Sequence, residues 1–149
     1  MDGDDLATLC RSCGMCCDGS LFGQVPLAPD EVPGARRNRL PVLDDGRGFR
    51  QPCPALARAE EGGVSCGVYD ERPAACRRFA CRLFERHRAE GGPLEARLAL
   101  VRRARELLAR LEASGLRGPE FAGERAGGSP AAEAYVELVL LMERDFARA

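Results

Sequence analysis

Apolar residues recur at helical spacing in the last third of the chain. Between Pro93 and Ser114 they are separated by three residues, four residues or the sum of the two, with arginines between them. This period predicts an amphipathic helix with an arginine-rich outer face. A second helix is predicted after Ser129-Pro130, a pair that suits a helix start. The apolar positions are Leu94, Leu98, Val101, Leu108 and Leu111 in the first helix, and Tyr135, Leu138, Val139, Met142 and Phe146 in the second.

A glycine- and proline-rich stretch from Gly115 to Gly128 separates these two helices and predicts a linker. Two helices joined in this way are typical of a helical hairpin, and we expect it to cover the core. The same hairpin could present a surface to a protein partner.

Shorter elements and many turn signals fill the first half of the chain. Residues 4–12 predict a short helix, residues 20–28 a short strand, and Pro29 a helix start. Residues 33–50 are rich in Pro, Gly and charge and predict a loop. Residues 53–69 predict a hairpin that turns at Glu61-Gly62-Gly63 and returns as a strand from Val64 to Tyr69.

Pro73 suits the start of a further helix, which we expect to run without interruption through residues 74–87 and to end at Gly91-Gly92. Together these elements predict a mainly α, small α+β fold. A cysteine-rich metal-binding core with a short hairpin is followed by the C-terminal helical hairpin. We expect residues 1–90 to form the cysteine-cluster domain and residues 91–149 to form a helical extension that packs on it as one compact unit.

Charge and targeting signals narrow the class of protein. The net charge of −1 gives no electrostatic basis for binding nucleic acid. No stretch has the length and apolarity of a membrane span, and the acidic N-terminus lacks the pattern of a secretory signal. We therefore expect a cytoplasmic protein with no nucleic acid or membrane partner. Thiols stay reduced in that compartment, which favours metal binding or redox chemistry over structural disulfides.

The cysteines are the candidate metal ligands of this sequence. Thiolates are soft ligands that suit zinc, Cu(I) and iron–sulfur clusters. Four-cysteine sites are common for zinc and for clusters, so eight cysteines can make two such sites, or one polynuclear site with spare thiols. The cysteines are Cys10, Cys13, Cys16, Cys17, Cys53, Cys66, Cys76 and Cys81.

The spacing of the first four cysteines is informative. Cys10, Cys13 and Cys16 are separated by two residues each, the spacing that begins the cluster loop of bacterial ferredoxins. Cys17 is adjacent to Cys16, and neighbouring side chains of an extended backbone point apart. We therefore expect that Cys16 and Cys17 do not easily serve one tetrahedral ion; they could serve two metals or two edges of one polynuclear cluster, or Cys17 could be a spare thiol. This slightly favours an iron–sulfur cluster over zinc as the cofactor.

The last two cysteines lie within the helix predicted after Pro73. Five residues separate Cys76 from Cys81, a rotation of about 140° on an ideal helix. Either the helix distorts there or the two sulfurs face different sites. The helix dipole favours a thiolate at Cys76, in the first turn. His87 is the only histidine and has no ligand spacing, so we expect an ordinary helix-surface residue.

Four separate blocks of the sequence resemble the CxxCxxCC cysteine-cluster family, often called YkgJ-like and described as zinc- or iron-chelating domains. The blocks are CRSCGMCC from Cys10, CPAL from Cys53, CGVY from Cys66, and RPAACRRFAC from Arg72 to Cys81. The resemblance covers about residues 10–84 and implies that all eight cysteines bind metal or an iron–sulfur cluster. Some larger relatives are flagellin lysine N-methylases, and from the length of the sequence we do not expect it to contain all of such an enzyme.

Three functions remain open from the sequence. The first is an iron–sulfur protein with a redox, sensing or carrier role. The second is a zinc-stapled interaction module whose C-terminal helices recruit a protein partner. The third is a methyltransferase-related enzyme or subunit. We identify no catalytic residue, and the sequence favours a role other than catalysis.

Overall fold

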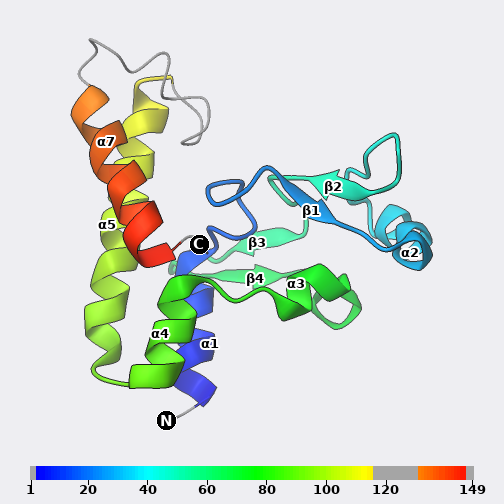
Figure 1. Ribbon diagram of the computed structural model, residues 1–149. Helices are drawn as coiled ribbons and strands as arrows, with labels where there is room; N and C mark the ends of the chain where they lie inside the picture. The colour runs from blue at the N-terminus through cyan, green and yellow to red at the C-terminus, as the bar shows by residue number, and fades with distance from the viewer. Residues whose placement is uncertain (1–2, 116–130, 147–149) are drawn as a thin grey trace. The chain divides into compact units, whose positions relative to one another are not determined.

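The computed structural model describes residues 3–115 and 131–146, which form a mainly helical, small α+β protein (Figure 1). The chain divides into two compact units. Cys10–Ala80 is the cysteine unit; the helical unit consists of the described residues of Met1–Leu9 and Cys81–Ala149. The predicted fold class is confirmed, whereas the packing of the two parts as one unit stays a prediction.

Two small antiparallel sheets organise the cysteine unit (Figure 1). In the first, Val25 of β1 lies opposite Phe49 of β2, and both are buried. The second is the predicted hairpin of β3 and β4, although the return strand ends at Cys66 rather than at Tyr69. The elements in order are α1 (Gly3–Cys13), β1 (Gln24–Pro26), η1 (Pro29–Glu31), α2 (Val32–Arg37), β2 (Gly48–Arg50), β3 (Leu56–Arg58), β4 (Val64–Cys66), η2 (Tyr69–Glu71) and α3 (Ala74–Arg78).

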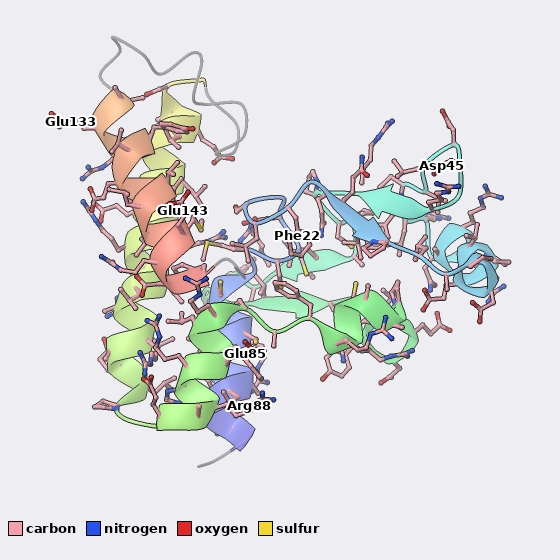
Figure 2. All side chains as sticks on the ribbon, viewed as in Figure 1. Phe22, Asp45, Glu85, Arg88, Glu133 and Glu143 are labelled. Carbon is pink, nitrogen blue, oxygen red and sulfur yellow. The ribbon has the colours of Figure 1, made fainter. Side chains whose placement is uncertain are left out.

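The core of this unit is apolar and small. Phe22, which is labelled in Figure 2, extends it with an edge-to-face contact to Phe79, at 5.0 Å between ring centroids. The predicted loop over residues 33–50 is wrong in part, because most of α2 and all of β2 fall within it. Ala35 and Phe49 from these elements are buried in the core, and this tertiary packing outweighs the local turn signals. The core residues are Val25, Leu27, Ala35, Leu40 and Phe49.

The helical unit contains α4 (Arg82–Glu90), α5 (Leu94–Ala113) and α7 (Ala132–Leu141), and α7 continues as a wider π-helical turn, η3 (Met142–Phe146). Helices α5 and α7 pack side by side, as the predicted hairpin requires (Figure 1). Leu107 rather than Leu108 is fully buried on α5. The predicted linker, apart from its first residue, and the Ser129-Pro130 cap lie outside the described residues.

The single helix predicted after Pro73 is wrong, because the chain breaks into α3 and α4. Phe79 and Cys81 both have extended backbone conformations between the two helices. The break lets Phe79 reach Phe22 in the core, and it makes Cys81 the first residue before α4. Helix α4 ends before Gly91, as expected. Within the described residues, no helix combines the length and the apolarity that crossing a membrane requires.

Candidate metal centre

The β3–β4 hairpin and the segments that flank it bring the backbone of three cysteines close together: Cys17, Cys53 and Cys66. The backbone N–H of Cys53 donates to the carbonyl oxygen of Cys17 over 2.7 Å. Cys66 lies opposite Leu56 in the hairpin, and the N–H of Leu56 donates to the carbonyl of Cys53 at 3.1 Å. Cys53 is therefore fixed between the turn after α1 and the end of β4.

Cys76 joins this group from α3. Its side chain and that of Cys53 pack against the same apolar core, which is formed around Phe49. Burial, followed by the neighbouring thiols of Cys17, Cys53 and Cys66, raises the pKa of Cys76 to about 11. The dipole of a five-residue helix is outweighed here, so the expected stabilisation of the Cys76 thiolate by its helix is not observed.

Cys53 and Cys17 also have raised pKa values, which favour the neutral thiol. Burial raises the pKa of Cys53, and the nearby thiols of Cys17 and Cys66 raise it further. A hydrogen bond with Cys16 and then burial raise the pKa of Cys17. The positive charge of Arg72 has the opposite effect and lowers the pKa of Cys17 and of Cys76. Neighbouring thiols whose deprotonated forms would repel one another are a donor set that a metal cation would stabilise, since it binds thiolates and releases their protons.

The thiols are near one another, but they are not arranged as the ligands of a metal ion. In residues 3–115 and 131–146, no three side chains of His, Cys, Asp or Glu are already arranged to hold a metal ion. The soft sulfur donors fit zinc or an iron–sulfur cluster in chemistry and in number. Binding would therefore require side-chain movements that close the thiols around the metal.

The geometry of the adjacent pair Cys16 and Cys17 differs from the prediction that the two thiols point apart. Their Sγ atoms are 3.9 Å apart, because residues 15–19 form a turn and not an extended strand. Two ligands of one tetrahedral zinc ion, with Zn–S bonds of about 2.3 Å, would have sulfurs about 3.8 Å apart. The adjacent cysteines are thus not forced toward different metals.

A buried methionine anchors the motif that contains this pair. Helix α1 ends at Cys13, and Gly14 follows in the left-handed conformation with φ of 72°. Met15 comes next and is completely buried. The side-chain amide of Gln51 donates to the carbonyl oxygen of Cys16 at 2.9 Å. Sequence reasoning missed Met15 and Gln51; an apolar residue inside a cysteine motif was the available signal for Met15.

Cys81 belongs to the helical unit, where it has a structural contact. Its Sγ accepts a hydrogen bond from the N–H of Phe84 at 3.4 Å and so caps α4. Burial raises its pKa. The structure thus supports the sequence alternative in which the helix is distorted between Cys76 and Cys81. Metal ligation by each of the eight cysteines stays a prediction.

The surface position predicted for His87 is wrong. Its side chain is 1% exposed, and within the described part of the chain neither ring nitrogen has a hydrogen-bond partner. Nε2 lies 3.9 Å from Oδ2 of Asp5. His87 follows the buried Leu83 by four residues on α4, so both side chains occupy the same inward face. That spacing was the signal in the sequence.

A protein-family model matches the cysteine-containing part of the chain. The model described as "CxxCxxCC: Putative zinc- or iron-chelating domain" matches residues 9–91, which is more than half of the chain and includes all eight cysteines. Searches of curated proteins and of solved structures found no match. The chain therefore belongs to the CxxCxxCC family of zinc- or iron-chelating domains.

Proposed function

We propose that this protein binds an iron–sulfur cluster and uses it in a redox, sensing or carrier role. The observation that carries the proposal is that the side chains of Cys53 and Cys76 pack against one apolar core and that the thiols of Cys17 and Cys66 act electrostatically on both. The ferredoxin-like spacing of Cys10, Cys13 and Cys16 favours a polynuclear cluster over an isolated ion.

The protein's own residues would control the cluster in two ways. The core around Phe49 covers one side of Cys53 and Cys76 and restricts the access of water to their sulfurs. Arg72 places a positive charge near Cys17 and Cys76, which offsets part of the negative charge of the thiolates. The cluster, when bound, supplies reversible one-electron transfer.

The test is to purify the full chain without oxygen, record its visible spectrum, and assay iron, acid-labile sulfide and zinc. A brown protein that contains iron and sulfide is the expected result. A colourless protein that contains stoichiometric zinc would contradict the proposal and support the second candidate.

The second candidate is a zinc-stapled interaction module, and an exposed apolar strip on α7 favours it. Val136 is 55% exposed and Leu140 is 58% exposed, one turn apart. Glu133 and Glu137 flank them, and Figure 2 shows Glu133 projecting from the start of α7. A partner helix with an apolar face, and a basic residue that reaches Glu133, would complement this strip, since Glu137 is already paired with Arg103 of α5. A Val136→Ser/Leu140→Ser variant should then lose the partner and keep its zinc.

A further inference from the structure

We propose that the exposed apolar strip of α7 joins two copies of this chain, with α7 of one copy packed antiparallel against α7 of the other in a symmetric dimer. The strip is formed by Val136 and Leu140, and charged side chains lie at its two ends, Glu133 and Arg144. This partner is named for the same strip that supports the second candidate function, and the dimer does not depend on which metal the cysteines bind.

The apolar strip is the part of α7 that water contacts at a cost. The described residues expose three large apolar side chains, and two of them, Val136 and Leu140, lie one turn apart here. Leu138, between them in sequence, is completely buried, so α7 is apolar on its exposed face as well as on its packed face. Together with Ala132 the two residues line a shallow surface pocket. Apolar surface of this kind favours association with a matching apolar surface.

The two ends of the strip have opposite charges. Glu133 precedes Val136 by three residues, and Arg144 follows Leu140 by four, so all four side chains share one face of the helix. Among residues 3–115 and 131–146, Glu133 has no ion-pair partner. Within the same part of the chain, the exposed guanidinium of Arg144 uses only its Nε, which donates to Asp145 at 2.8 Å. Each end therefore retains a charged group that can pair with a second molecule.

The order of these side chains makes the surface complementary to itself in one direction. The midpoint between Val136 and Leu140 is position 138, and the midpoint between Glu133 and Arg144 differs from it by half a residue. A twofold axis at this position places Val136 against Leu140 of the second copy, and Glu133 beside Arg144 of the second copy at both ends. A parallel arrangement would place each of the two end charges against its own kind, and like charges repel.

Glu137 is the remaining charge beside the strip, and it does not oppose the pairing. It lies near the proposed axis, where the carboxylates of two copies would approach each other. Arg103 of α5 donates two hydrogen bonds to it, at 2.7 Å and 2.6 Å, and balances its charge. Two large apolar side chains per copy are few for a specific interface, which commonly has about 20–30 residues a side. We therefore expect a dimer that dissociates on dilution.

The experiment measures the sedimentation velocity of the full chain from micromolar to millimolar concentrations, with reductant present so that disulfides cannot link two copies. We expect a reversible equilibrium between monomer and dimer, and no dimer for Val136→Ser/Leu140→Ser. Glu133→Arg should weaken dimerisation about tenfold, because both end pairs become repulsive. Glu60→Arg makes the same charge change at an exposed turn of the cysteine unit, and this matched control should keep the wild-type dissociation constant.

A mixture of two charge variants tests the direction of pairing. Glu133→Arg and Arg144→Glu each place like charges at both ends of their own dimer, whereas one chain of each kind forms two attractive pairs when the helices are antiparallel. The equimolar mixture should therefore regain the dimerisation that each variant has lost. Circular dichroism establishes that both variants are folded. The wild-type and Glu133→Arg measurements do not require Arg144→Glu, so a failure of that variant to fold does not decide the outcome.

Four results would overturn the inference. They are a wild-type chain that stays monomeric at every concentration, a dimer that survives Val136→Ser/Leu140→Ser, equal weakening by Glu133→Arg and Glu60→Arg, and folded charge variants that do not associate when mixed. Iron, sulfide and zinc are assayed in the same samples. A monomer that contains iron and sulfide would refute the dimer alone, whereas a dimer without metal would refute the proposed function alone.

Discussion

Gly14 lies so close to Val64 that a Cβ placed on it would be 3.1 Å from both γ-methyl carbons of the valine. The turn that carries Cys16 and Cys17 is thus packed directly against the hairpin that carries Cys66. Gly14→Ala should destabilise the cysteine unit by about 1–2 kcal/mol from the left-handed backbone alone, plus the cost of the contact. Chemical denaturation measures the change. Gly62→Ala is the matched control, because Gly62 also has positive φ but open space around it; equal losses in the two variants would contradict the packing argument.

Glu31 links η1 to α3 by accepting the N–H groups of Ala28 and Ala74 at 2.9 Å and 2.7 Å. These hydrogen bonds, with that of Ala74 the stronger influence, lower the pKa of Glu31. The folded state therefore favours the ionised carboxylate, and its stabilising contribution is present at neutral pH and is lost as the pH falls below about 4. Glu31→Gln should cost about 1 kcal/mol at pH 7 and much less at pH 3. Urea denaturation of the metal-free protein at both pH values tests this, and a difference that persists at pH 3 would argue against it.

Asp145 is a buried carboxylate in the π-helical turn, and Arg86 of α4 donates to it at 2.9 Å. Arg144 contacts its other oxygen at 2.8 Å but is 68% exposed, so solvent screens that interaction more strongly. Arg86→Met should therefore destabilise the helical unit by about 1–3 kcal/mol, since it leaves a buried charge poorly compensated. Arg144→Met should cost less than about 1 kcal/mol. The same cost in both variants, measured by thermal unfolding, would show that the burial of Asp145 is not decisive.

The buried imidazole of His87 lacks hydrogen-bond partners within the described residues, which is an unfavourable arrangement for a polar group. His87→Leu should therefore keep or increase the stability of the helical unit, and it should leave the metal content unchanged. Leu83→Ala, one turn earlier on the same face, should instead cost about 2–5 kcal/mol by opening a cavity. Calorimetry and metal analysis of both variants test whether His87 has a structural role and is not a metal ligand. A His87→Leu protein that loses metal would make His87 a ligand and contradict the structural role.

Arg72 is held with its guanidinium 3.7 Å from the centroid of the Tyr69 ring, and its Nε donates to the Tyr69 carbonyl. Its charge lowers the pKa of Cys17 and of Cys76, against the larger effects that raise them. Arg72→Gln should weaken zinc binding by about fivefold, the factor that corresponds to a partly exposed charge pair of about 1 kcal/mol.

Arg37→Gln, an exposed arginine on α2, is the matched control for the change in net charge. Competition with a chromophoric chelator measures the zinc affinity of both variants. Equal weakening would mean that the overall charge of the protein matters and the position of Arg72 does not.

The sequence was sufficient to predict those elements of the fold whose signal is local. The period of apolar residues predicted α5 and α7, and the turn at Glu61-Gly62-Gly63 predicted the β3–β4 hairpin. The sequence was insufficient where a contact between distant positions of the chain decides which element forms. The break before α4 depends on Phe79 reaching Phe22, 57 positions earlier in the chain, and no local pattern encodes that pairing.

The candidate site shows the same limit. The spacing of the cysteines identified the metal chemistry, which the family match supports. It left open which thiols are neighbours, because that depends on the hydrogen bond between Cys53 and Cys17 and on the core that Cys53 shares with Cys76. Likewise, the sulfurs of Cys16 and Cys17 approach each other because of a turn whose geometry is set by Gly14 and Met15.

The burial of Met15 has a consequence for anyone who wishes to transplant this motif. A synthetic peptide or grafted loop that copies only the positions of the cysteines would lack the side chain that fixes the turn, and its thiols would sample many arrangements before any metal arrived. A faithful copy needs an apolar residue between Gly14 and Cys16 and a pocket on the host to receive it. The transferable unit is thus the cysteine spacing together with its hydrophobic anchor.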